Sequence, residues 1–164
     1  MGSKLSNADY SENYCSAILQ TNGDFLFLIN SEKIKFNGQE HCDAILAEID
    51  NQKKIKLYFI ELKNASKTNK EEYEKLVHKI IDKGRHSMEI FNKRIKPSLE
   101  DLLNDRYNYF DKIFVIYLDE EFANFIVSKQ HILEKTSVGT LKKLYKNISI
   151  NSCGRKLDDP IILL

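Results

Sequence analysis

Residues 54–63 read Lys-Ile-Lys-Leu-Tyr-Phe-Ile-Glu-Leu-Lys, a run that is long and apolar enough for a buried strand. Side chains two residues apart lie on the same face of a strand. One face carries apolar side chains that lead up to a charged end, in the order Ile55, Leu57, Phe59, Glu61 and Lys63. The other face is apolar, with Tyr58, Ile60 and Leu62. A strand that is apolar on both faces is typical of the centre of a sheet covered on both sides.

The sequence before this strand predicts a first helix and two further strands. Residues 9–20 place apolar side chains at helical spacing, with Asp9 or Ser11 as the cap. Strand-like runs follow at residues 25–29, with a continuation to Phe36, and at residues 41–49. Turn signals separate these segments at Asn22-Gly23, Asn37-Gly38 and residues 50–52.

The sequence after this strand changes to helical periodicity. Apolar residues that step by three and four predict a long amphipathic helix over residues 69–95, which ends before Pro97. Further elements are expected as a helix from Pro97, a buried strand at 112–118, helices around 122–133 and 141–145, a strand at 148–150 and a tail at 161–164. The order predicts an α/β fold in which helices flank a mixed sheet.

Length and composition limit the classes of protein to consider. The chain has 164 residues, enough for one domain over residues 1–164, and 25 basic against 24 acidic side chains give a formal net charge of +1. No apolar run approaches 18 residues, so no membrane span is expected. No Gly-rich phosphate-binding motif is present, so no nucleotide cofactor is expected.

The three cysteines, Cys15, Cys42 and Cys153, are far apart and form no CxxC motif. This spacing favours three reduced thiols over a disulfide scaffold or a structural zinc site. The N-terminus also lacks the apolar core of a signal peptide. A cytoplasmic location is therefore expected.

Three charged residues at the ends of predicted strands form the candidate site. Asp43 opens the second strand, and Glu61 and Lys63 close the third. Because a short turn joins these strands, antiparallel pairing would bring the carboxylates of Asp43 and Glu61 together. Two such carboxylates repel each other unless a cation lies between them. Carboxylate oxygens with room for water and phosphate are typical ligands of Mg²⁺.

Asp43, a hairpin and then Glu61-Leu62-Lys63 resemble the signature of the PD-(D/E)xK nuclease superfamily, over roughly residues 10–120. The resemblance implies a restriction-endonuclease-like αβββαβ core. It implies that Asp43, Glu61 and the backbone carbonyl of Leu62 hold Mg²⁺ or Mn²⁺, by a one- or two-metal mechanism. Lys63 would orient or activate the attacking water, or neutralise the phosphate.

Two features of the family pattern are less regular in this chain. The family places a proline before the aspartate, whereas this sequence has Cys42. Many members carry a further acid on the first helix, for which Glu12 is the matching candidate and Glu40 the rival. His41 lies two residues before Asp43 and is a weaker candidate for contact with the site.

Two segments of the chain are basic despite its balanced total charge. Residues 63–96 hold ten Lys or Arg against five acids, and residues 129–156 hold seven against one. Such segments favour binding to a phosphate backbone. The candidate contacts are Lys67, Lys75, Lys79, Lys83, Lys142 and Lys143. Because Lys outnumbers Arg 21 to 4, we expect backbone-directed binding rather than reading of a base sequence.

The sequence therefore predicts a metal-dependent endonuclease that hydrolyses phosphodiester bonds. DNA is favoured over RNA through the resemblance alone. The resemblance also implies a possible homodimer, since one site cuts one strand and small members of the superfamily often work as dimers. The exposed part of residues 97–150 is the candidate interface. The alternative is a catalytically inactive nuclease-fold protein that acts as a nucleic-acid-binding or assembly module. An α/β enzyme acting on a small molecule is a third possibility.

Overall fold

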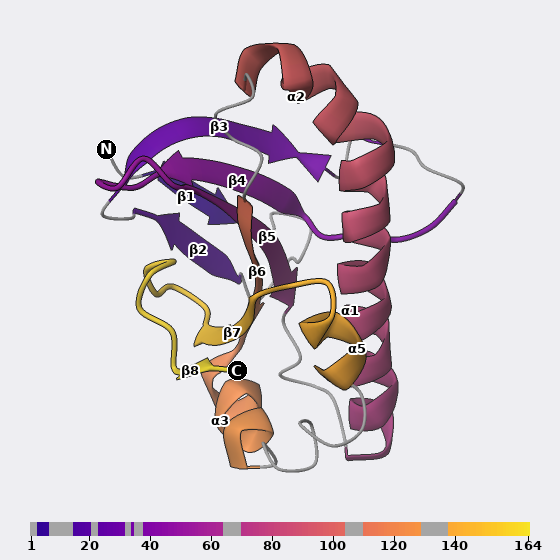
Figure 1. Cartoon of the computed structure of the whole chain (residues 1–164). Helices are drawn as coiled ribbons and strands as arrows, with labels where there is room; N and C mark the ends of the chain where they lie inside the picture. Colours follow the sequence, from indigo (N-terminus) through magenta and orange to yellow (C-terminus); the bar gives the residue numbers. More distant parts are fainter. Residues whose placement is uncertain are drawn as a thin grey trace.

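The computed structural model describes residues 3–6, 15–20, 23–31, 34, 38–63, 70–103, 110–128 and 138–164. Its centre is a six-stranded mixed sheet in the order β3-β4-β5-β6-β7-β8 (Figure 1). These strands span Asp24–Asn30, Ala44–Ile49, Ile55–Lys63, Phe110–Leu118, Asn147–Ser152 and Ile162–Leu163. Helices α1 (Lys70–Ile90), α2 (Lys96–Leu103), α3 (Glu120–Ser128) and α5 (Val138–Lys142) accompany it. The predicted α/β fold with a mixed sheet is confirmed.

Strand β5 lies in the middle of the sheet, as its apolar pattern predicts. It pairs antiparallel with β4 on one side and parallel with β6 on the other. Leu57 and Phe59 are fully buried in the larger core, and Ile60 is fully buried in the smaller core on the opposite face. Because each face of β5 packs against a core, apolar side chains in this strand do not alternate with polar ones.

Helix α1 covers the face of the sheet that carries the larger core. Ile80, Met88 and Ile90 on this helix pack in that core with residues of α3 and α5. Gly84 allows the close approach, because a Cβ atom there would lie 3.0 Å from both Leu141 and Phe114. The Tyr145 hydroxyl donates a hydrogen bond of 2.5 Å to the Gly84 carbonyl and fixes this crossing.

The predicted end of the long helix before Pro97 is wrong. Helix α1 passes into a π-helical turn, η2 (Phe91–Ile95), and α2 follows at once. The Lys96 N–H donates to the Phe91 carbonyl across five residues. A proline inside an α-helix removes one hydrogen bond and clashes with the preceding turn. The wider π turn accommodates Pro97, which stands at the second position of α2 as the predicted second helix requires.

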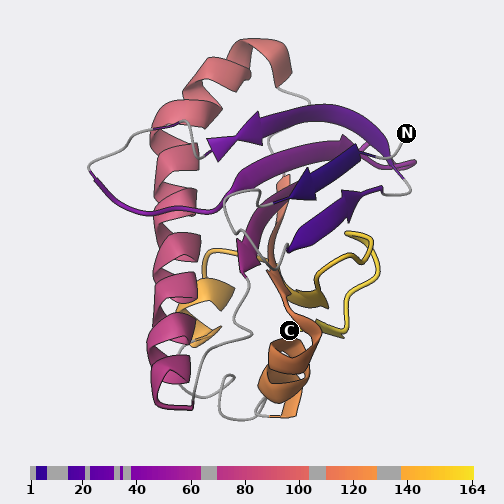
Figure 2. The same ribbon diagram turned by 180° about the vertical axis from the view of Figure 1, so that it is seen from behind.

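The opposite face of the sheet carries a hairpin that the sequence did not predict. Strands β1 (Ser3–Ser6) and β2 (Ser16–Leu19) pair antiparallel. In Figure 2 this hairpin lies in front of β4 and β5, with α1 at the left. The prediction of a helix over residues 9–20 is therefore wrong for residues 16–19, while residues 9–14 lie outside the described residues. Cys15, Ala17 and Leu19, each two residues apart, pack in the smaller core, and this period of two outweighed the weak helical spacing.

A disulfide joins Cys15, just before β2, to Cys153, just after β7. The prediction of three reduced thiols is thus wrong for this pair, and Cys42 is the free cysteine. No sequence pattern indicates this pairing, because the two residues are 138 positions apart and meet only through the fold. Disulfides persist mainly in oxidising environments. The cytoplasmic location therefore stays a prediction, and the disulfide between Cys15 and Cys153 does not favour it.

The other boundaries differ from the sequence pattern by small amounts. Strand β3 ends at Asn30, and the next residue, Ser31, donates its N–H to the Asp43 carbonyl. Residues 32, 33 and 35–37 of the expected continuation lie outside the described residues. Strand β4 begins at Ala44 rather than at His41. The expected turn at residues 50–52 is present, with Asp50 Oδ1 accepting hydrogen bonds from the backbone of Gln52 and Lys54. Residues 129–133 of the expected helix lie outside the described residues.

None of the helices in the described residues has the length and apolar composition that crossing a bilayer requires.

Candidate metal centre

Asp43 and Glu61 stand opposite each other on paired strands. In the antiparallel register of β4 and β5, Ala44 faces Ile60, so the next position places Asp43 against Glu61. The Asp43 N–H donates to the Ile60 carbonyl at 2.9 Å. The Leu62 N–H donates to Asp43 Oδ2 at 2.7 Å. The structure therefore brings the two predicted carboxylates to one end of β5, on the face that α1 covers.

Glu61 is fully buried, with 0% of its surface exposed. Its Oε1 atom accepts an ion-paired hydrogen bond of 2.7 Å from Lys83 Nζ, whereas its Oε2 atom has no hydrogen-bond partner in the described residues. Burial raises the pKa of Glu61 to about 8, and the Asp43 carboxylate adds to this rise. Lys83 and Lys63 oppose it through their positive charges. The site thus holds a carboxylate that is only partly compensated.

Lys83 comes from the middle of α1 and points at the sheet. Burial lowers the pKa of its ammonium, but the charges of Glu61, Asp43 and Glu40 and the hydrogen bond to Glu61 hold the pKa above its ordinary value. The side chain keeps 16% of its surface exposed. Lys83 is therefore a charged partner of Glu61, and a contact with a phosphate backbone would require this ion pair to open.

The remaining predicted residues fall into three groups. Lys63 is half-buried at the end of β5 on the Glu61 face, and its charge acts on Glu61. Lys75, Lys79, Lys142 and Lys143 are exposed on α1 and around the end of α5. Glu12 and Lys67 lie outside the described residues.

Glu40 and His41 hold the chain that leads into β4. The Glu40 carbonyl contacts the His86 ring at 3.1 Å, and the Glu40 side chain is exposed. The His41 ring contacts the Ile34 carbonyl at 2.7 Å and the Cys42 carbonyl at 3.1 Å. Both ring nitrogens of His41 are thus engaged with the backbone, which explains its place beside Asp43 without a role in the chemistry.

Ser87 connects α1 to the start of β4. Its hydroxyl accepts a hydrogen bond of 2.7 Å from the Cys42 N–H and donates one of 2.6 Å to the Lys83 carbonyl. Ser87 is 1% exposed, so these bonds are shielded from water. Burial raises the pKa of the adjacent Cys42 thiol to about 12, which keeps it neutral. Ser87 therefore positions Asp43 relative to Lys83, and Cys42 is not an activated nucleophile.

We expect Ser87→Ala to lower the free energy of unfolding by about 1–3 kcal/mol, because the Cys42 N–H would be buried without an acceptor. Ser98→Ala is the matched control, since Ser98 also donates to the carbonyl four residues earlier but is exposed. That change should cost less than about 0.5 kcal/mol. Urea unfolding of both variants measures the difference. Equal costs would contradict the positioning role of Ser87.

The donors present fit a Mg²⁺ or Mn²⁺ ion. No group of three or more His, Cys, Asp or Glu side chains suited to a metal occurs in the described part of the chain. Mg²⁺, however, binds through one or two carboxylates and keeps several waters. Asp43 and Glu61 supply two carboxylates, and Glu61 Oε2, which has no hydrogen-bond partner in the described part of the chain, is an oxygen donor of the required kind. The carbonyl of Leu62 lies between Glu61 and Lys63 along the same strand and completes the predicted set.

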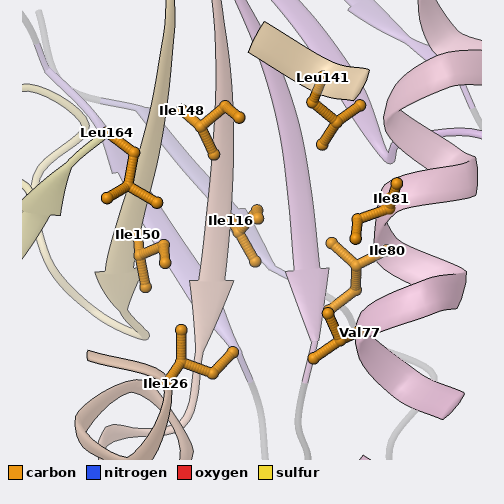
Figure 3. A pocket seen from close by; sticks show the side chains of 9 residues that line it. All are labelled: Val77, Ile80, Ile81, Ile116, Ile126, Leu141, Ile148, Ile150 and Leu164. Carbon is orange, nitrogen blue, oxygen red and sulfur yellow. The ribbon is translucent and has the colours of Figure 1, made fainter. Parts of the chain in front are cut away.

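An apolar cavity of about 30 Å³ lies beside α1 but contains none of these residues (Figure 3). Its lining consists of carbon side chains from α1, α3, α5, β6, β7 and the C-terminus, namely Val77, Ile80, Ile81, Ile116, Ile126, Leu141, Ile148, Ile150 and Leu164. With no polar side chain in the lining, the cavity has no group that could activate water or bind phosphate.

Glu48 is a second buried carboxylate, on the other face of β4. It is 3% exposed; its Oε1 accepts a hydrogen bond of 2.8 Å from the Tyr58 hydroxyl, and its Oε2 has no partner in the described residues. Burial raises the pKa of Glu48 above its ordinary value of 4.5; the Tyr58 hydrogen bond and Lys56 oppose this, while Asp158 and Asp50 reinforce it.

This raised pKa predicts a pH dependence of stability. Folding favours the protonated form of Glu48, so its contribution to the free energy of unfolding is fully present below about pH 4.5 and falls as pH rises through the folded-state pKa. Glu48→Gln should remove this contribution. The stability of the wild type relative to Glu48→Gln should therefore decrease between pH 4 and pH 7 in urea unfolding. A pH-independent difference would contradict the assignment.

The sequence analysis named Lys83 only as a candidate contact with a phosphate backbone and did not single out Ser87. Both residues lie on the same face of α1, four positions apart. This spacing was the sequence signal that could have grouped them. Comparison with family models, curated proteins and solved structures finds no match for this chain. The site must therefore be interpreted from its own geometry.

Proposed function

We propose that this protein is a metal-dependent nuclease with a restriction-endonuclease-like core, in which Asp43, Glu61 and Lys63 form the active site. The main supporting observation is the pair of carboxylates at the end of β5. One of them, Glu61, is fully buried and has an oxygen without a hydrogen-bond partner among the residues that the structure describes. A buried, partly compensated carboxylate costs free energy, and such groups concentrate at functional sites. The order β3, β4, β5, α1 and β6 agrees with the βββαβ part of the core that the sequence resembles.

Each residue has a distinct role in the proposed reaction. Asp43, Glu61 and the Leu62 carbonyl would hold Mg²⁺ or Mn²⁺. The bound ion supplies Lewis-acid polarisation of the phosphate and a lowered pKa of bound water. A water loses a proton to solvent as its oxygen forms a new bond to phosphorus, the bond to the leaving oxygen breaks, and the leaving oxygen takes up a proton from solvent. Lys63 stabilises the negative charge that develops on the phosphate.

The exposed lysines support a nucleic-acid substrate. Lys75 and Lys79 lie on the helix that supplies Lys83. Lys142 is the last residue of α5, which packs on this helix at Gly84, and Lys143 follows it. Point charges on lysines suit a phosphate backbone. DNA in preference to RNA, and a homodimer that cuts both strands, remain part of the proposal through the family resemblance.

The experiment incubates pure protein with plasmid, branched DNA, single-stranded DNA and RNA. Cleavage is expected with Mg²⁺ or Mn²⁺ and none with a chelator. Absence of cleavage of every substrate in both metals would contradict the proposed activity.

One observation favours a second candidate, a module that binds nucleic acid without cutting it. The Lys83 ammonium occupies one oxygen of Glu61, where an active site would place its metal ion. A gel-shift assay run beside the cleavage assay distinguishes the two. Binding that weakens with salt but yields no cleaved product would select this second candidate.

A further inference from the structure

The cationic partner of Glu61 in this structure comes from the protein itself. Lys83 Nζ lies 2.7 Å from Glu61 Oε1, and Glu61 is shielded completely from water. A buried carboxylate requires a compensating charge. The ammonium supplies it, and does so at one of the atoms that a metal ion would bind.

The compensation by Lys83 is incomplete. Glu61 Oε2 remains buried without a hydrogen-bond partner in the described residues, and the adjacent Asp43 carboxylate adds a second negative charge. A divalent cation carries twice the charge of an ammonium and can bind oxygens of both carboxylates. It would therefore bind Asp43 together with the Glu61 oxygen that Lys83 does not contact.

The two partners differ in their access to water. Lys83 keeps 16% of its side chain exposed, and its head group is a hydrated point charge on a flexible four-carbon stem. It can turn to solvent by side-chain rotation, without movement of α1. Glu61 lies within the central strand at 0% exposure and has no such freedom.

We propose that Lys83 is a built-in competitor of the divalent cation, which holds Glu61 in the metal-free protein and must be displaced from it when Mg²⁺ or Mn²⁺ binds. This inference rests on the proposed function, because it assigns the metal to Asp43 and Glu61. Its consequence is weak metal affinity in the free protein. Neutralising Lys83 removes the competing charge and should tighten metal binding.

The test measures Mn²⁺ affinity without nucleic acid, by the electron paramagnetic resonance signal of free Mn²⁺. Lys83→Met is expected to bind Mn²⁺ at least tenfold more tightly than the wild type. Lys83→Gln, which retains a hydrogen-bond donor for Glu61 and so protects the fold, should show the same direction. Lys83→Arg keeps the charge and should stay within about threefold of the wild type.

Two controls test whether the change in Mn²⁺ affinity depends on the pair of Lys83 and Glu61. Lys146→Gln breaks an ion pair of similar length, 2.8 Å to Asp111, in an exposed setting, and should leave the affinity unchanged. Glu61→Gln should weaken Mn²⁺ binding at least tenfold in both the wild-type and the Lys83→Gln background. Mn²⁺ binding that does not depend on Glu61 would overturn both the inference and the proposed active site.

The remaining outcomes separate the two proposals. Glu61-dependent Mn²⁺ binding that is equal or weaker in Lys83→Gln would overturn the competitor role alone and leave the nuclease proposal standing. Tighter Mn²⁺ binding in Lys83→Gln would support the competitor role. If Lys83→Gln binds Mn²⁺ more tightly but the wild type cleaves no nucleic acid, the proposed nuclease activity is contradicted while the competitor role stands.

Discussion

Glu61→Gln and Lys63→Ala should each reduce Mg²⁺-dependent cleavage of nucleic acid at least about 100-fold, because each removes charge directed at the metal or the reacting phosphate. The glutamine keeps the shape of Glu61 but loses the negative charge that a divalent cation requires. Initial rates of plasmid cleavage, with circular dichroism to confirm folding, measure the effect.

Glu89→Gln is the matched control for this loss of activity. Glu89 also accepts an ion-paired hydrogen bond from a lysine, at 2.6 Å from Lys93, but on the exposed side of α1. Its replacement should leave the cleavage rate within about twofold, since a surface ion pair contributes little. Activity that survives both Glu61→Gln and Lys63→Ala would contradict the assignment of the site.

Lys83→Met should destabilise the metal-free protein by about 3 kcal/mol, because it leaves the fully buried Glu61 without its partner. Glu61→Gln should cost less, since the ammonium that remains is partly exposed and can reach water. The two partners of one ion pair are thus expected to differ in cost. Urea unfolding in the presence of a chelator measures both.

The control for this asymmetry is Lys146→Met, which breaks the exposed ion pair with Asp111. We expect a cost below about 1 kcal/mol. A cost of Lys83→Met no larger than that of Lys146→Met would show that Glu61 does not depend on the ammonium. Added Mn²⁺ should recover part of the stability of Lys83→Met by binding the folded state.

The central strand and its neighbours could be predicted from the sequence because their side chains alternate with a period of two. Apolar side chains at both Leu57 and Tyr58 required cover on both faces, and the structure supplies it. The short turn at residues 50–52 then fixed antiparallel pairing, which placed Asp43 opposite Glu61. This part of the candidate site followed from local pattern alone.

The features that the sequence did not predict depend on contacts between distant segments. Cys15 and Cys153 meet because the hairpin and the segment after β7 pack on the same face of the sheet, which no local pattern encodes. Pro97 indicated a helix end, but the wider π-helical turn before it accommodates the proline and the chain stays helical. Lys83 resembled its exposed neighbours in sequence, and only the packing of α1 directs it to Glu61.

The most direct test of the account is a crystal structure determined with Mn²⁺, using the anomalous signal of the metal. We predict a peak between Asp43 and Glu61, with carboxylate oxygens of both residues at about 2 Å and Lys83 Nζ turned away from Glu61. A map with no peak at this position, and Lys83 still paired with Glu61 at millimolar Mn²⁺, would contradict it.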